Sequence, residues 1–168
     1  MDLEKAIRTA IEYETKVREL FEDASSSTND PVGKRIFHML AKDEKHHVDY
    51  LTDALKEWIR TGKVTYGKLA STLPAKGTIA AAVRELETGL EDHHRSSNTL
   101  AILRKALDAE IETSEFYSKM VDELPDNRRG LFAGILEIEE AHKAFVQVQI
   151  DNIMRTGVWL DVWRFQIE

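Results

Sequence analysis

Glu44-Lys45-His46-His47 and Glu139-Glu140-Ala141-His142 are the two stretches of sequence that decide the fold. Each one places a glutamate three residues before a histidine, and the second follows the first at an offset of 95 residues. In an α-helix, residues at this spacing lie about 4.5 Å apart along the axis and point to nearly the same side. A glutamate and a histidine so placed can bind one metal ion together. Two such pairs therefore predict two metal positions.

The two halves of the chain repeat beyond these stretches. Ala10-Ile11-Glu12-Tyr13-Glu14 matches Ala106-Leu107-Asp108-Ala109-Glu110 at an offset of 96, and Arg60-Thr61-Gly62 matches Arg155-Thr156-Gly157 at 95. Three matches at nearly one offset indicate a duplication. We therefore expect two helical hairpins related by a pseudo-twofold axis, with repeat halves at about 3–62 and 99–157.

Proline and glycine are scarce and clustered, and long stretches with helical periodicity lie between the clusters. These stretches predict long helices at about 2–25, 31–61, 98–123 and 127–156, with a further short helix within 78–92. Apolar residues recur at steps of three and four along each long helix, which is typical of the inward face of a bundle. No stretch alternates polar and apolar residues, so strands are not expected. The predicted fold class is all-α, a four-helix bundle with a two-fold internal repeat.

The connection at 63–98 is too long for a tight turn between neighbouring helices. It can cross the length of the bundle, about 40 Å for a helix of 25 to 30 residues, so one long crossover is predicted. Residues 1–157 then form one domain, and 158–168 form a C-terminal tail. The bundle could close within one chain, or two chains could exchange hairpins.

Each predicted long helix carries one glutamate on its inward face. Four buried carboxylates cost many kcal/mol unless cations or protons balance them. Two divalent cations neutralise four carboxylates, and mixed oxygen and imidazole ligands suit iron or manganese, with zinc also able to bind. The predicted cofactors are therefore two iron ions, with manganese or zinc as alternatives, and the predicted ligands are Glu14, Glu44, His47, Glu110, Glu139 and His142.

The other histidines and one tyrosine are further candidates for roles in the same site. Tyr117 lies two turns after Glu110 on the same helix face, where its hydroxyl could contact a bridging ligand or take part in redox chemistry. It is the candidate catalytic residue, although a core aromatic would fit the same position. His46 points about 100° away from His47, so it is expected at the surface. His38 falls off the inward face, and His93-His94 is expected in a solvated linker.

Composition excludes several other classes of site. The 168 residues contain no cysteine, which rules out a disulfide, an iron–sulfur cluster or a rubredoxin-type iron centre within this sequence. The formal net charge is −7 and no basic stripe is present, which argues against a nucleic-acid partner. No apolar run approaches the length of a membrane span, and the start lacks the pattern of a signal peptide, so a cytoplasmic location is expected.

At these residues the sequence resembles the ferritin-like superfamily, and most closely its rubrerythrin-like members. The resemblance is carried by the two Glu…Glu-x-x-His halves, by Glu110…Phe116-Tyr117, and by the tail segment Gly157-Val158-Trp159-Leu160-Asp161. It implies a di-iron carboxylate redox protein that reduces peroxide or dioxygen, oxidises ferrous iron, or does both. A homodimer or a larger homo-oligomer would also be expected.

Two departures from rubrerythrins narrow that expectation. Rubrerythrins usually carry a rubredoxin domain, which the absence of cysteine excludes here, so an external electron donor such as a rubredoxin-type protein would be required. They also carry an extra glutamate one turn after the ligand that corresponds to Glu110, on the helix at about 98–123, where this chain has Thr113. The remaining ligand set is similar to the ferroxidase centre of bacterioferritin. Iron binding or storage without significant turnover is the alternative function.

Overall fold

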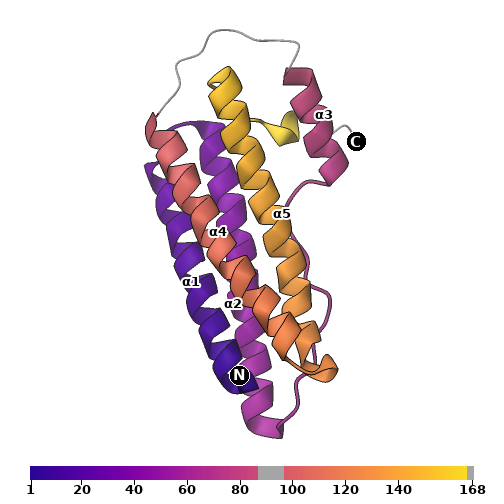
Figure 1. The fold of residues 1–168 in the computed structure, drawn as a ribbon. Coiled ribbons are helices and arrows are strands. Elements are labelled where there is room, and N and C mark those ends of the chain that lie inside the picture. Colours follow the sequence, from indigo (N-terminus) through magenta and orange to yellow (C-terminus); the bar gives the residue numbers. More distant parts are fainter. Residues whose placement is uncertain (87–96, 166–168) are drawn as a thin grey trace.

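The computed structural model describes residues 1–86 and 97–165, and these are helical over most of their length. Four long helices run side by side (Figure 1): α1 (Leu3–Ser27), α2 (Pro31–Thr61), α4 (Ser97–Glu123) and α5 (Asp126–Thr156). A shorter helix, α3 (Lys76–Leu86), lies on the connection between α2 and α4, and the 3-10 turn η1 (Val162–Phe165) follows α5. The described residues contain no strand, so the prediction of an all-α fold is confirmed.

The ends of the four long helices agree with the sequence prediction to within two residues. The short helix expected within 78–92 is also present, but it begins earlier, at Lys76. The last six residues of that predicted range lie outside the described residues, as do His93 and His94. The linker role expected for these two histidines therefore stays a prediction.

Local capping explains where the helices begin and end. Asp30 starts α2, because its side chain accepts hydrogen bonds from the backbone N–H groups of Val32 and Gly33, and Pro31 supplies a first-turn φ suited to a helix. Gly62 and Gly157 end α2 and α5 with φ values of 67° and 78°, in the left-handed region that glycine adopts without strain. The repeated Arg-Thr-Gly is thus a helix stop in both halves.

The inward faces of the helices divide into two apolar clusters with a polar layer between them. One cluster includes Phe21, Phe37 and Val146, and the other includes Leu3, Leu51 and Phe132. Glu14 on α1 follows a member of the second cluster and precedes a member of the first, and Glu139 on α5 does the same. Along α2 and α4 the order is reversed, but Glu44 and Glu110 again lie between the two clusters. The polar layer is therefore enclosed by hydrocarbon on both sides along the helix axes.

The C-terminal tail packs against this framework. Trp159, Leu160 and Val162 are buried members of the first apolar cluster, and the Trp159 ring contacts Phe37 edge-on. Gln149 on α5 holds the tail at both polar groups of Leu160, accepting from its N–H at 2.9 Å and donating to its carbonyl at 3.0 Å. The tail thus closes the end of the helical core near Gly33 and contributes to its hydrophobic burial.

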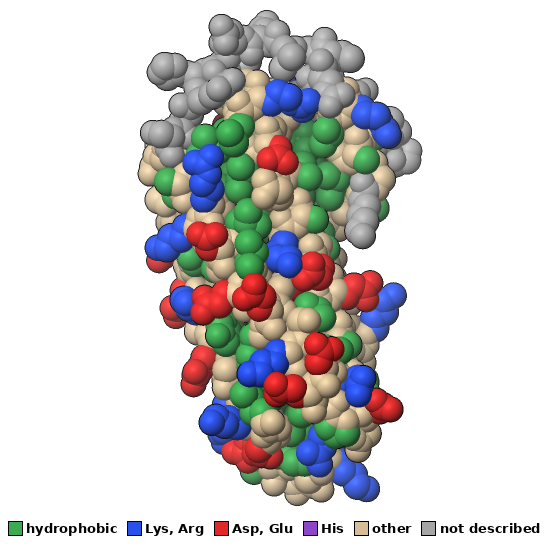
Figure 2. Space-filling model, viewed as in Figure 1, with side chains coloured by type: hydrophobic (Ala, Val, Ile, Leu, Met, Phe, Trp, Pro, Cys, Tyr) green, Lys and Arg blue, Asp and Glu red, His purple; other side chains and the backbone are tan. Residues whose placement is uncertain are grey.

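The surface mixes charged and apolar side chains. Figure 2 shows acidic and basic side chains interspersed over the lower half of one face, and apolar side chains gathered between α5 and α3 in the upper half. Among the described helices, none has the length and apolar character needed to cross a membrane.

Candidate metal centre

The six predicted ligands meet in the polar layer between the apolar clusters, and all six are fully buried. They form two overlapping groups in which every member offers one ligand atom within 4.8 Å of the others. The first group is Glu14, Glu44, His47 and Glu139, and the second is Glu44, Glu110, Glu139 and His142. These buried groups could each hold a metal ion.

The two groups share Glu44 and Glu139, one glutamate from each half of the chain. In the structure, the glutamate of each Glu-x-x-His pair also lies within reach of the opposite half. The shared carboxylates can therefore bridge two ions, while Glu14 and Glu110 each belong to one position.

His47 faces three carboxylates through a single ring atom. Its Nδ1 lies 3.2 Å from Glu14 Oε2, 3.1 Å from Glu44 Oε2 and 3.1 Å from Glu139 Oε1. These carboxylates come from α1, α2 and α5, so one imidazole nitrogen lies where three helices meet. The other nitrogen, Nε2, is buried without a hydrogen-bond partner.

His142 faces the second group through the same ring atom. Its Nδ1 lies 2.8 Å from Glu44 Oε1 and 3.5 Å from Glu110 Oε1. The two histidine rings are nearly parallel, with centroids 5.9 Å apart. Both imidazoles thus direct Nδ1 to the shared carboxylates, as two neighbouring metal positions would require.

Asp43 holds the opposite nitrogen of His142, and the sequence analysis missed it. The Nε2–H of His142 donates to Asp43 Oδ2 at 2.9 Å, and both side chains are fully buried. Because Nε2 carries the proton in this hydrogen bond, Nδ1 of the neutral ring keeps its lone pair for a metal. A signal for Asp43 existed, since it lies between Leu40 and His47 at helical spacing and so shares the inward face.

The crossover fixes Asp43 in turn. Ser71 Oγ donates to Asp43 Oδ2 at 2.6 Å, and Thr72 donates to Oδ1 from both its N–H at 2.8 Å and its hydroxyl at 2.7 Å. Burial alone would raise the pKa of Asp43, but the hydrogen bonds from His142, Ser71 and Thr72 outweigh it and lower the pKa to about 2. Asp43 is therefore a fixed anion beside the site.

The corresponding place in the other half is apolar. At the offset of 95, Asp43 matches Ile138, so no carboxylate from that position can hold His47. This agrees with the unpartnered Nε2 of His47. The two halves of the site are thus unequal, although the ligand residues themselves repeat.

The contact made by Tyr117 is a second difference between the two halves of the site. Its fully buried hydroxyl donates to Glu14 Oε1, which leaves Glu14 Oε2 toward the site. Burial and then the charge of Glu14 raise the pKa of Tyr117 well above its usual value, so the hydroxyl stays protonated. The matching residue in the other half is Phe21, and neither carboxylate oxygen of Glu110 has a hydrogen-bond partner.

The unpartnered atoms provide a test of whether the site suits cations. Buried polar atoms are almost always hydrogen-bonded, yet seven ligand atoms here make no hydrogen bond of normal geometry, although His142 Nδ1 and Glu44 Oε1 lie in ion-pair contact at 2.8 Å. The seven atoms are Glu44 Oε1, His47 Nε2, Glu110 Oε1 and Oε2, Glu139 Oε1 and Oε2, and His142 Nδ1. Six of the seven, all except His47 Nε2, are acceptor atoms that converge on the polar layer. The donor set fits two cations bound by oxygen and imidazole nitrogen.

The titration behaviour leads to the same interpretation. Burial, followed by the charge of Glu44, raises the pKa of Glu14 to about 7. Burial, followed by Glu139 and Glu44, raises the pKa of Glu110 well above its usual value. Burial lowers the pKa of His47 and His142, but nearby carboxylates, Glu44 first, raise both well above the usual value. Without cations, protons must balance the carboxylates, so metal binding would release protons.

The remaining sequence predictions for this region can be placed in the structure. His46 and His38 are exposed on α2, as expected. Thr113 is buried and donates to the carbonyl of Ala109 at 2.9 Å. No carboxylate extends the ligand set from that position.

Comparisons with known proteins add a fold likeness. No family model matches the chain, and no curated protein matches it. A solved structure, that of a hypothetical protein from Pyrococcus furiosus, is similar at 17% identity over 92% of each chain, with a TM-score of 0.65. At this identity the likeness concerns the fold, and the description of that protein gives no activity.

Proposed function

We propose that this protein is a di-iron carboxylate redox protein of the rubrerythrin-like kind, built on a ferritin-like four-helix bundle with one long crossover and a two-fold internal repeat. The observation that carries the proposal is the pair of buried Glu/His groups sharing Glu44 and Glu139. Two redox-active ions held close together by shared carboxylates would supply two electrons, one from each ion. Iron fits the donor set and, unlike zinc, changes oxidation state.

The bound ions would supply two electrons, one from each ferrous ion, to peroxide or dioxygen. The protein's own groups would manage charge and protons. Glu44 and Glu139 can shift between one ion and both, because each lies within reach of both positions. Asp43 keeps the His142 ring oriented, and the Tyr117 hydroxyl restrains Glu14.

Protons accompany metal binding at this site. In the metal-free protein the pKa of Glu14 is raised to about 7, so its carboxyl holds a proton near neutral pH that it would release when a metal binds. The apolar clusters on both sides keep bulk water out, which strengthens electrostatic interactions within the layer. The electron donor that restores the ferrous state would be a separate molecule, because the sequence holds no cysteine for a rubredoxin-type centre.

Anaerobic loading with ferrous iron, followed by stopped-flow mixing with peroxide or dioxygen, tests the proposal. We expect about two irons per chain and a rapid absorbance change with at least one oxidant. Binding of two irons without oxidation by either would favour the alternative, iron binding without turnover, and overturn the redox assignment. A higher iron load in a large assembly would favour storage.

Two variants on α4 make the test specific. Glu110→Ala removes a buried ligand and should abolish binding of at least one iron. Glu115→Ala is the matched control, because Glu115 is exposed on the same helix. Equal loss of iron in both variants would show that the ions bind elsewhere.

A further inference from the structure

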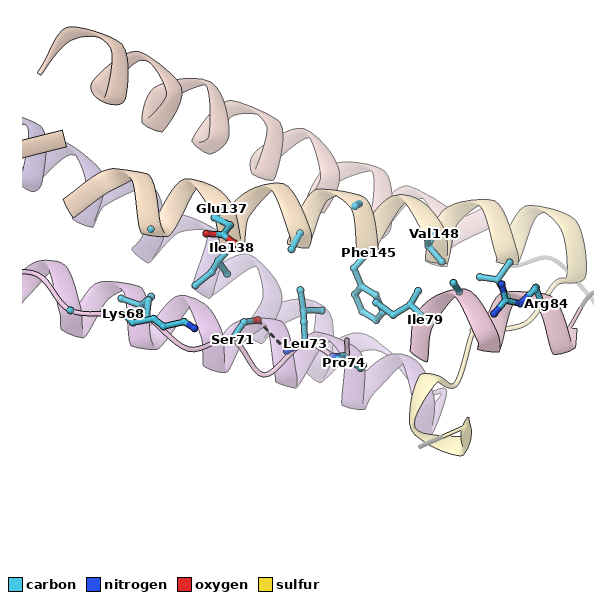
Figure 3. Close-up of a pocket in the computed structure, with 17 residues that line it drawn as sticks. Lys68, Ser71, Leu73, Pro74, Ile79, Arg84, Glu137, Ile138, Phe145 and Val148 are labelled. Carbon is cyan, nitrogen blue, oxygen red and sulfur yellow. Dashed lines mark hydrogen bonds between the residues drawn. The ribbon is translucent and has the colours of Figure 1, made fainter. Parts of the chain in front are cut away.

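A long apolar groove runs along the outer face of α5. It is separate from the polar layer formed by the six candidate metal ligands, which is called the metal layer below. Its volume is about 810 Å³, and its walls come from α5, α3 and the crossover between Gly67 and Pro74. Figure 3 shows these elements facing one another with side chains directed into the space between them. Pockets for small ligands measure about 300–1,000 Å³ and are mostly apolar, so the groove has the size of a ligand site.

The walls of the groove are hydrocarbon along most of its length. Phe145 and Ile138 are buried at its floor, and Leu73, Ile79, Val83 and Val148 are half-buried along its sides. Half-buried apolar side chains of this kind leave surface that a ligand could remove from water, at about 25 cal/mol per Å². The groove therefore favours an apolar occupant.

The shortage of polar side chains narrows the chemical class of that occupant. Lys68, Ser71, Arg84 and Glu137 are the polar side chains among the lining residues that the structure describes. Ser71 is already engaged, since it donates to Asp43 and accepts from the N–H of Leu73 at 3.1 Å. A peptide would bring an N–H and a carbonyl for every residue, and these groups cost free energy when buried unpaired. An alkyl chain brings none.

The two ends of the groove differ in charge. Lys68 and Glu137 lie at one end and offset each other's charge, whereas Arg84 lies at the other end, near Val148 (Figure 3). Among the described residues of the lining, Glu137 is the one acidic side chain, and it lies at the end away from Arg84. From Glu137 to Val148, α5 extends for about 16 Å. An elongated ligand with one anionic end would place that end at Arg84.

We propose that this groove binds a long-chain carboxylate of the fatty-acid class, with the chain along α5 and the carboxylate at Arg84. The site lies beside the metal layer and shares Ser71 with the hydrogen bonds that hold Asp43 and His142. Its binding surface contains none of the six candidate metal ligands. The proposal therefore stands whether or not the metal layer carries out redox chemistry.

Displacement of the fluorescent fatty acid cis-parinaric acid by palmitate tests the proposal, on metal-free protein in EDTA and on metal-loaded protein. We expect one saturable site per chain in both forms, with palmitate binding about tenfold more tightly than hexadecanol, which lacks the charge. Absence of saturable binding in both forms would overturn the proposal. Binding to phosphatidylglycerol vesicles without displacement by palmitate would also overturn it, because the surface would then recognise a membrane.

Variants locate the ligand within the groove. Ala144 is exposed in the groove wall, so Ala144→Trp should fill it and abolish palmitate binding, while Ala133→Trp, outside the lining of the same helix, should leave binding unchanged. Arg84→Gln should weaken palmitate about tenfold and leave hexadecanol unchanged, with Lys105→Gln as the control for lost positive charge. Undiminished binding in Ala144→Trp would overturn the proposal. The proposal would also be overturned if the unmodified chain binds no palmitate and the Ala144→Trp variant changes its oligomeric state.

Discussion

Single residues decide how the two halves of the metal layer differ. At offsets of 95 and 96 residues, Asp43 corresponds to Ile138 and Tyr117 to Phe21, so the residues behind the candidate ligands differ between the two halves of the sequence. The position around His142 has an oriented imidazole, whereas the position around His47 has a hydroxyl that restrains its terminal carboxylate. The two candidate metal positions therefore have chemically different surroundings.

Asp43→Asn tests the first of these contacts. The variant keeps the shape of the side chain but removes the charge that stabilises the Nε2–H of His142. Loss of such a partner typically costs about 10–100-fold in metal affinity. We expect a cobalt(II) titration to show one of two binding events weakened by this amount. Asp49→Asn, which changes an exposed aspartate on the same helix, serves as the control. Equal weakening of both events would contradict the assignment of Asp43 to one position.

Tyr117→Phe tests the second contact. Removal of the hydroxyl takes away the donor to Glu14 and should destabilise the metal-free protein by about 1–3 kcal/mol. The hydroxyl is not a predicted ligand, so two metal ions should still bind. Urea unfolding with and without metal measures both effects, and Tyr13→Phe, at a half-buried ring stacked on Phe116, is the control. Loss of a metal ion in Tyr117→Phe would mean that the tyrosine is itself a ligand.

At the scale of elements, the contact between α2 and the C-terminal tail fixes the closed end of the core. A Cβ on Gly33 would approach the Trp159 ring to 2.5 Å, which is too close for either group to stay in place. Gly134 on α5 offers the opposite environment, because a Cβ there meets nothing within 4 Å. The same substitution should therefore have opposite effects at these two helical positions.

Gly33→Ala should destabilise the protein by about 1–3 kcal/mol, because the tail must move away from α2. Gly134→Ala should stabilise it by about 0.5–1 kcal/mol, because alanine is the better helix former. Thermal unfolding of both variants beside the unmodified chain measures the pair. A destabilisation of equal size in both would show that the tail contact is not the cause.

At the scale of the whole molecule, buried charge makes stability depend on pH and metal together. In the metal-free protein, the pKa of Glu14 rises from 4.5 to about 7 on folding, so the folded state binds more protons in that window. Stability must then fall as pH rises through it. The raised pKa values of His47 and His142 act in the same direction above about pH 6.5. Asp43 acts oppositely, but only as pH falls from about 4 toward 2.

We therefore expect metal-free protein in EDTA to unfold at a lower urea concentration at pH 8 than at pH 5. Excess manganese(II) should reverse the order, because cations replace the protons that pH 8 removes. Urea unfolding at both pH values, in EDTA and in manganese(II), measures the effect. A metal-free protein that is more stable at pH 8 would contradict the assignment of Glu14 and the two histidines to one buried layer.

The sequence predicted the helices and their inward faces because both depend on local periodicity. In the first, third and fourth long helices, apolar residues at steps of three and four, such as Leu3, Leu103 and Phe132, are buried. Trp58, near the end of the second long helix, is half-buried. The six candidate ligands could be found because glutamate and histidine on an otherwise apolar face break that periodicity in each helix.

Tertiary structure alone decided how these six residues are shared and what surrounds them. The sharing of Glu44 and Glu139 depends on distances between helices, which spacing along one helix cannot give. Asp43 acquired its role from Ser71 and Thr72, on an extended segment whose path has no periodic signal, and from His142, which lies 99 residues away. The sequence thus determined which residues face inward in each helix. Packing between the helices and the crossover determined which of them meet, because those contacts join residues far apart in the chain.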